Sequence, residues 1–298
     1  MAVSRRPFAA EKSGADKEQT VSILQDYSLE MTAKERAELD LAAPRIALGT
    51  QIAVAFLPDE DMDGRIAAAR HIRDLGFEPM PHLSARRIRS EAELFRMVEG
   101  CANEAAVDRV FLVAGDPPVP EGPFADTLSM IRTGIFEANG IRTISIAGHP
   151  EGHPVMDAFQ LAYFMDQKIA EIASRGMTST FVTQFSFDPQ ALVNWLVDLR
   201  GRGITVPVRL GVPGPAGVRR LLRYAAFCGV GATTSALRKY GISLSKLMGT
   251  AGPDRLIKEL EVGLTDEVSP ANLHFYPFGG LDATVQWIAK HAADELAL

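Results

Sequence analysis

The chain has 298 residues, 47% of them hydrophobic and 23% charged, so it can bury a large core and is neither fibrous nor disordered. Its formal net charge of -6 argues against a broad phosphate-binding face for DNA or RNA and favours a small-molecule partner. The two cysteines, Cys101 and Cys228, have no metal-type or CxxC spacing, and we expect both to be buried thiols.

Residues 1–20 are polar and of mixed charge, which predicts a flexible arm and not a signal peptide. A single domain is expected over residues 21–298. No apolar run reaches the roughly 18 residues of a membrane helix, so we predict a cytoplasmic protein without a membrane partner.

Short β-branched or aromatic runs then alternate with amphipathic segments, as in repeated βα units. The pattern predicts eight strands, over residues 25–31, 51–56, 77–80, 110–113, 143–147, 180–184, 207–211 and 273–276. Helices are expected over residues 63–75, 91–104, 125–139, 155–175, 189–202, 216–227 and 281 to the end.

Helix start and stop signals support these ranges. Ser90 and Glu93 have capping-box spacing, and Asp188 precedes a proline as a helix N-cap. Gly140 and Gly176 can end the helices before them. An extra helical stretch over residues 235–264, interrupted at a Gly-Pro pair, is an insertion between the seventh and eighth strands.

The eight alternating units predict an α/β fold of the (β/α)8 TIM barrel type. A doubly wound open sheet is the alternative, but no GxGxxG follows the first strand, and polar residues follow many strands instead of lying near one switch point. In a barrel the loops after the strands build the site. The polar residues at these strand ends are Glu30, Asp116, His149 with His153, and Gln184.

Each of these residues also has an ordinary structural interpretation. Glu30 could belong to a solvated polar face, Asp116 to a plain turn, and Gln184 could cap its strand end. His149 and His153 lie four residues apart, but the prolines beside them disfavour the continuous helix that a metal pair would need, so no metal site is predicted.

Several sequence blocks follow the order and spacing of one enzyme family. They are VAGDPP from Val113, IAGHPEGHP from Ile146, TQFSFD from Thr183 and LHFY from Leu273, with Pro81-His82-Leu83 as a fifth. Through these blocks the chain resembles the methylenetetrahydrofolate reductases over residues 27–289. The resemblance implies the same barrel.

The resemblance implies hydride transfer from NADH or NADPH to FAD and on to 5,10-methylenetetrahydrofolate, giving 5-methyltetrahydrofolate for one-carbon metabolism. It makes Glu30 the general acid at N10, and an apolar barrel mouth would help to keep that acid protonated. It assigns catalysis to Glu30, Asp116 and Gln184, and folate contacts to the last two. The cofactor residues that it implies are His82, Ala114, Gly115, Asp116, His149, His153 and Lys168. His274 is expected to be structural.

Departures from the family pattern keep other functions open. The family's aromatic and proline frame around the acid is absent at residues 29–34, and its arginine before the glycine is Ala114. Gln167 and the apolar residues 161–165 replace polar flavin contacts, which leaves open a flavin-free reductase that uses NAD(P)H directly. A non-catalytic folate-binding barrel is a further alternative. The sequence does not fix the reaction direction, the choice of NADH or NADPH, or whether the chain forms a homo-oligomer.

Overall fold

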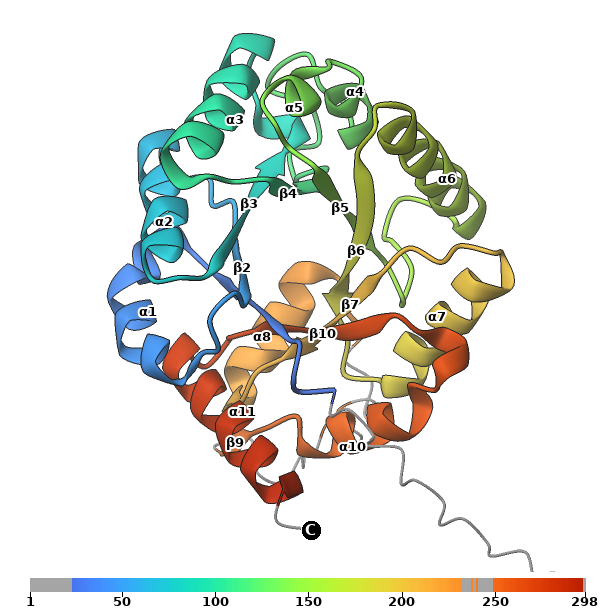
Figure 1. Ribbon diagram of the computed structural model, residues 1–298. Coiled ribbons are helices and arrows are strands. Elements are labelled where there is room, and N and C mark those ends of the chain that lie inside the picture. Colours follow the sequence, from blue (N-terminus) through green and yellow to red (C-terminus); the bar gives the residue numbers. More distant parts are fainter. Residues whose placement is uncertain (1–22, 232–236, 238–239, 241–248, 297–298) are drawn as a thin grey trace, which may run out of the picture.

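The computed structural model describes residues 23–231, 237, 240 and 249–296, which form a ring of strands inside a ring of helices (Figure 1). The predicted arm over residues 1–20 and most of the first half of the predicted insertion lie outside the described residues. None of the described helices is long and apolar enough to cross a membrane.

Eight parallel strands close into a barrel in the order β1-β10-β7-β6-β5-β4-β3-β2. The strands are β1 (Ser28–Met31), β2 (Gln51–Val54), β3 (Glu78–Ser84), β4 (Arg109–Val113), β5 (Thr143–Gly148), β6 (Thr178–Phe185), β7 (Val208–Pro213) and β10 (Ala271–Tyr276). Pairing of Ser28 with His274 and of Leu29 with Phe275 closes the ring. The predicted TIM barrel and all eight of its strands are confirmed.

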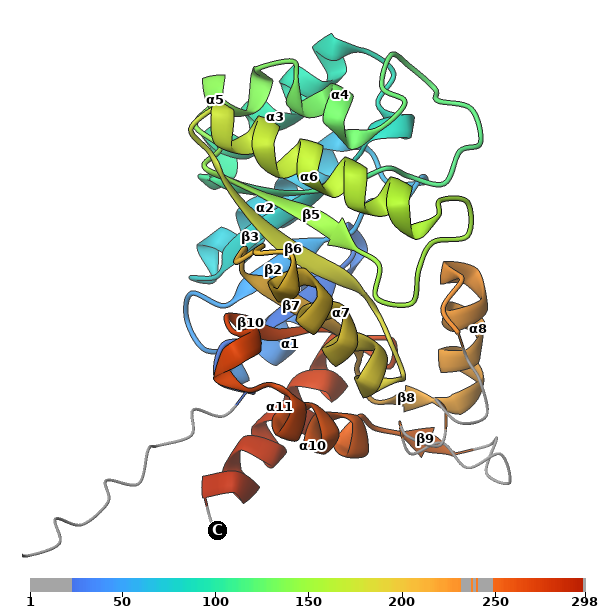
Figure 2. The same ribbon diagram turned by 90° about the vertical axis from the view of Figure 1, so that its right-hand side faces the viewer.

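Most of the helices cover the outside of the barrel, whereas α8 (Val218–Cys228) lies at one end of it, beyond the arrowhead of β5 (Figures 1 and 2). The helices are α1 (Arg36–Ala42), α2 (Met62–Asp74), α3 (Glu91–Ala105), α4 (Thr127–Ile131), α5 (Ile135–Ala138), α6 (Ala158–Ser174), α7 (Pro189–Gly201), α8, α10 (Asp254–Gly263) and α11 (Leu281–Leu296). Gly140 and Gly176 adopt positive φ angles after their helices, as predicted. Asp188 caps α7 as predicted, by accepting from the Gln190 N–H.

Four features differ from the sequence expectations. The range 125–139 is two helices, because Gly134 adopts a φ of +80° between them. Helix α1 was not predicted; it follows a capping box in which the Glu35 carboxylate accepts from the Thr32 N–H. The two-residue strands β8 (Ala216–Gly217) and β9 (Thr250–Ala251) pair as a small antiparallel sheet. Cys101 is buried as expected, whereas Cys228 is only partly buried.

Strand alternation separates two cores. Residues such as Leu29, Leu83 and Phe275 point outward and pack under the helices. The residues between them point into the barrel, where Ala53, Met80, Phe111 and Val182 form a separate apolar layer. Glu30, His82 and His274 occupy inward-facing positions of the same kind, so the alternation that builds the core also directs these side chains into the barrel.

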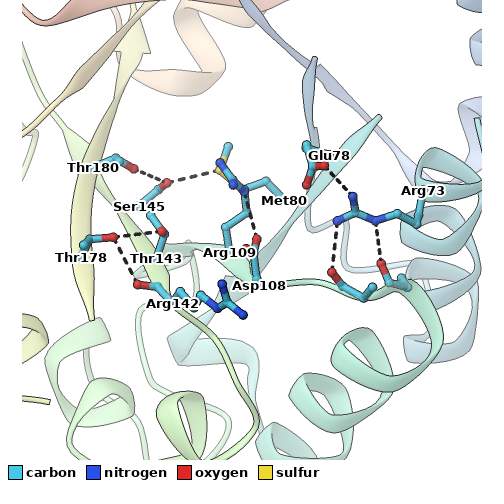
Figure 3. A network of polar contacts seen from close by, with 12 residues as sticks. Arg73, Glu78, Met80, Asp108, Arg109, Arg142, Thr143, Ser145, Thr178 and Thr180 are labelled. Atoms are coloured by element: carbon cyan, nitrogen blue, oxygen red, sulfur yellow. Dashed lines mark hydrogen bonds and ion pairs between the residues drawn. The ribbon is translucent and has the colours of Figure 1, made fainter. Parts of the chain in front are cut away.

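A network of polar contacts lies in the amino-terminal half of the strands (Figure 3). Inside, the Ser145 hydroxyl contacts the Thr180 hydroxyl at 2.7 Å and the Met80 sulfur at 3.2 Å. At the strand beginnings the Gln51 amide faces two guanidinium groups, and in the orientation that directs its oxygen toward them it accepts from Arg109 Nη1 at 2.9 Å and Arg209 Nη2 at 3.1 Å. These contacts lie at the end of the barrel opposite to the loops that follow the strands.

Candidate active site

Three buried ionisable side chains meet inside the barrel near the carboxyl ends of β1, β3 and β10. Glu30 Oε2 lies 3.4 Å from His82 Nε2 and 3.7 Å from His274 Nε2. The Glu30 side chain is 19% exposed, and His274 is fully buried. None of these three atoms has a hydrogen-bond partner within the described part of the chain, so polar groups converge here without being saturated.

His274 is held in place by the strand that carries the carboxylate. Its Nδ1 lies 2.8 Å from the Ser28 hydroxyl, which can also donate to the Leu273 carbonyl at 3.4 Å. Its ring meets Tyr276 edge-on at 4.8 Å. His274, expected from the sequence to be structural, is a neighbour of Glu30. The sequence indicates that His274 has an inward position in the last strand. It does not show that this position faces Glu30, because that depends on the register of β1 against β10.

The electrostatics of the cluster differ from the expectation of a carboxyl kept protonated by apolar surroundings. Burial raises the pKa of Glu30, but the neighbouring rings of His274 and His82 lower it by more, so the net pKa is lowered. Burial lowers the pKa of His82 to about 4, against a smaller opposing effect of Glu30. His82 is therefore neutral near pH 7.

A cavity of about 600 Å³ lies between the ends of β4 and β5 and helix α6, and its lining does not include Glu30, His82 or His274. Its apolar wall includes Leu161, Phe164, Met165 and Trp195. Its polar lining includes Arg86, Asp116, Asp126, His149, His153 and Lys168. Six residues that the resemblance assigned to the cofactor thus share one cavity, namely Ala114, Gly115, Asp116, His149, His153 and Lys168. His82 belongs instead to the Glu30 cluster.

The two histidines of this cavity are largely neutral near pH 7. Burial, with the charges of His153 and Lys168, lowers the pKa of His149 to about 4. The pKa of His153 is also lowered, by burial and by Lys168. The two imidazole rings meet edge-on at 5.0 Å. Across the described residues no group of three or more His, Cys, Asp or Glu side chains could hold a metal ion.

The loop after β4 has a well-defined shape. Gly115 adopts a φ of +92°, and a Cβ added there would lie 2.2 Å from the Ser84 hydroxyl, so this position requires glycine. Ser84 was not singled out from the sequence. The Asp116 carboxylate is 67% exposed and receives two bonds from Arg87, at 2.9 and 2.8 Å. Its partner in the structure is therefore an arginine of the adjacent loop.

Gln184 makes a local contact at the end of its strand, whereas Glu151 contacts residues that are distant in the sequence. The Gln184 Oε1 accepts from the Phe185 N–H at 3.1 Å, which corresponds to the strand-end interpretation. Its role as a folate ligand stays a prediction. Glu151 accepts from the buried Ser186 hydroxyl at 2.5 Å and from the Gly231 N–H at 2.8 Å. It therefore links the loops after β5 and β6 to the residues that follow α8.

A closed parallel barrel with ionisable side chains gathered at the carboxyl ends of its strands places the chain in the (β/α)8 class. The methylenetetrahydrofolate reductase family model matches residues 55–243. The chain belongs to the methylenetetrahydrofolate reductase family.

Two plant relatives and one solved structure illustrate the similarity. The chain is 28% identical over 134 residues to methylenetetrahydrofolate reductase (NADH) 1 of Arabidopsis thaliana, covering 41% of this chain and 23% of that protein. It is 27% identical over 169 residues to the Zea mays enzyme of the same name, covering 48% and 28%. These matches span about a quarter of the plant proteins.

The fold also resembles an uncharacterized Clostridium thermocellum protein that binds two copies of 5-methyl-5,6,7,8-tetrahydrofolic acid. The TM-score is 0.60 at 15% identity, covering 92% of this chain and 96% of that one. At this identity the likeness supports the barrel alone.

Proposed function

We propose that the protein reduces 5,10-methylenetetrahydrofolate to 5-methyltetrahydrofolate, with NADH or NADPH as hydride source, FAD as carrier and Glu30 as general acid at N10. One observation carries the proposal: Glu30 is a buried carboxylate at the end of β1 whose Oε2 has no hydrogen-bond partner among the described residues. Family membership supports the substrate class. The ligand named for the Clostridium thermocellum protein is the product of the proposed reaction.

The chemistry requires a proton at N10 when the ring that bridges N5 and N10 opens, and a positioned carboxylic acid can supply it. In the free protein the neighbours of Glu30 lower its pKa. A pterin seated over Glu30 would remove its remaining exposure, and burial is the effect that raises this pKa.

The cavity between β4, β5 and α6 suits a flavin dinucleotide. Trp195, Phe164 and Met165 offer apolar surface to a planar ring, while Lys168 and Arg86 offer positive charge to phosphates. When bound, FAD supplies reversible hydride acceptance and donation. His149 and His153 are neutral near pH 7 and would contact the cofactor as hydrogen-bonding groups without charge.

Direct hydride transfer from NAD(P)H is the second candidate. It is favoured by the cavity-facing side of α6, where Leu161, Phe164 and Met165 present apolar atoms at positions that the flavin enzymes fill with polar groups. Both candidates keep Glu30 as the acid. They differ in whether the cavity holds a flavin throughout turnover.

An absorbance spectrum of the protein purified with FAD separates these candidates. We expect a flavin band that bleaches when NADH is added anaerobically and returns with methylenetetrahydrofolate. Folate-dependent loss of NADH without bound flavin would establish direct transfer. Folate binding without either signal would replace the enzyme proposal with a binding barrel. Adding 5-methyltetrahydrofolate to the oxidised protein tests the reverse direction.

Replacement of Glu30 by glutamine tests the acid. Glu30→Gln keeps the size of the side chain but cannot deliver the proton, so we expect folate reduction to fall by about a hundredfold or more while flavin reduction by NADH survives. The control is Glu38→Gln on α1, where the carboxylate accepts from the Asp282 N–H at 3.4 Å, away from the Glu30 cluster. Unimpaired folate reduction by Glu30→Gln, measured by stopped-flow, would remove Glu30 from the mechanism.

A further inference from the structure

The cavity between β4, β5 and α6 has an uneven charge balance. Two of its lining side chains are cations, Arg86 after β3 and Lys168 on α6. Its lining carboxylates are already engaged: Asp116 forms a bidentate pair with Arg87, and Asp126 caps α4 by accepting from the Ser129 N–H at 2.8 Å. The carboxylates thus have partners within the protein, whereas neither cation forms an ion pair among the described residues.

Lys168 is the first of these cations. It lines the cavity and forms no ion pair among the described residues. Burial lowers its pKa, and the charge of Asp126 only partly opposes this effect. A buried ammonium group without a partner is costly, and an anionic ligand in the cavity would relieve that cost.

Arg86 is the second cation, and its hydrogen-bonding capacity is mostly unused. Its backbone N–H binds the Ala114 carbonyl at 2.9 Å, which fixes its position against the loop after β4. Its guanidinium gives one hydrogen bond, from Nη2 to the Pro118 carbonyl, and its buried Nε has no partner within the described part of the chain. A planar guanidinium with free donors is suited to phosphate oxygens.

The neighbouring arginines differ from Arg86. Arg87 is committed to Asp116 and also contacts Glu121 at 3.3 Å. Arg89 has a side chain that is 77% exposed, and its guanidinium contacts the Glu121 carboxylate at 3.7 Å. Neither of them lines the cavity. Arg86 is therefore the arginine of this loop that can meet a ligand, and Arg89 provides a matched control.

We propose that Arg86, together with Lys168, recognises the diphosphate of the dinucleotide cofactor, so that the cavity selects the diphosphate form of the flavin over the uncharged riboflavin. This inference rests on the proposed function, because it takes the cavity as the cofactor site. Arg86 is a specificity residue in this scheme: it binds the anionic part of the ligand and leaves the ring to the apolar wall.

The test is equilibrium binding of FAD and riboflavin to the full chain, followed by flavin fluorescence. We expect the wild type to bind FAD at least about tenfold more tightly than riboflavin, because one charge-assisted hydrogen bond changes the affinity by about that factor. Arg86→Gln should lower FAD affinity by about tenfold without changing riboflavin affinity, and Arg86→Lys should recover part of the loss. Arg89→Gln should bind both flavins as the wild type does. Added salt should weaken FAD binding less in Arg86→Gln than in the wild type.

The outcomes separate this inference from the proposed function. Wild-type FAD affinity in Arg86→Gln, with the hydride relay intact, would overturn the role of Arg86 alone. An equal loss of FAD and riboflavin affinity would show that Arg86 supports the cavity shape and would also overturn it. If the wild type binds no flavin, the flavin proposal fails, and NADH, which carries the same diphosphate, becomes the probe. Weaker NADH binding by Arg86→Gln would then uphold anion recognition, and unchanged NADH binding would overturn it.

Discussion

His82 is a buried base whose ionisation opposes folding. Its pKa in the folded protein is about 4, against an ordinary value of 6.5, because burial disfavours the charged ring. As the pH falls from 6.5 toward 4, the unfolded chain takes up a proton that the folded His82 does not, so acid favours unfolding over this window. The shift corresponds to about 3 kcal/mol at most.

We therefore predict that the free energy of unfolding declines between pH 6.5 and 4, and that His82→Asn makes this decline shallower. Urea titrations across this range measure it. Glu30 acts at lower pH: its folded pKa lies below 4.5, so its contribution is present above 4.5 and is lost as the pH falls through the folded value. An equally steep decline in His82→Asn would show that His82 is not the group responsible.

The sequence could predict the place of Glu30 near a strand end, but not the surroundings of its side chain. A polar residue at the end of an alternating strand is recognisable from the sequence alone. Its contacts with His82 and His274 come from strands elsewhere in the chain, and only the barrel register brings them together. The bidentate bond from Arg87 to Asp116 and the contact of Ser84 with Gly115 are equally non-local.

The loop elements above the barrel are linked by Glu151. It accepts from Ser186 and from the Gly231 N–H, so it connects the loops after β5 and β6 to the end of α8. We predict that Glu151→Ala lowers the free energy of unfolding by about 1 kcal/mol, because the loss of a hydrogen bond typically lowers stability by about that amount. Hydrogen exchange at the Gly231 amide should become faster.

Glu151→Gln is the matched control for this prediction, since it retains one acceptor oxygen and should give a smaller effect. Unchanged exchange at Gly231 in Glu151→Ala would contradict the linking role. Mass spectrometry of the peptide that contains Gly231 is sufficient for the comparison.

Long periodic elements were predictable, and short ones were not. The capping signal at Ser90 and the Pro at the start of α7 identify true helix beginnings. Helix α1 has seven residues, too few for a periodicity to stand out from a polar segment. The pairing of β8 with β9 depends on two residues in each strand and has no sequence signal. Gly134 divides a predicted helix because its positive φ interrupts the helical backbone.

In the molecule as a whole, the two ends of the barrel have different tasks. The Glu30 cluster and the cavity lie at the carboxyl ends of the strands, while Gln51, Arg109 and Arg209 form a polar group at the opposite end. In such barrels the first end carries function and the second carries stability. The alternation of strands and helices was enough to predict this division.

We predict that Gln51→Leu lowers the free energy of unfolding by about 1 to 3 kcal/mol, because it removes an acceptor that Arg109 and Arg209 share, although Arg209 keeps its bond to Asp26. Folate reduction at saturating substrate should not change, since the site lies at the other end. Gln51→Glu retains an acceptor oxygen for the two arginines and should keep the free energy of unfolding of the wild type. Denaturant titration and steady-state rates measure both effects, and a loss of activity in folded Gln51→Leu would refute the separation.

The seam between β1 and β10 has a consequence for how activity is acquired. Ser28 and His274 are in contact across 246 positions of sequence, and Glu30 meets His274 at this same seam. During ribosomal synthesis the strand that carries Glu30 emerges near the beginning, and the strand that completes its surroundings emerges near the end. Most of the barrel can therefore form before the Glu30 cluster exists, and nascent chains that lack β10 should be partly folded without it.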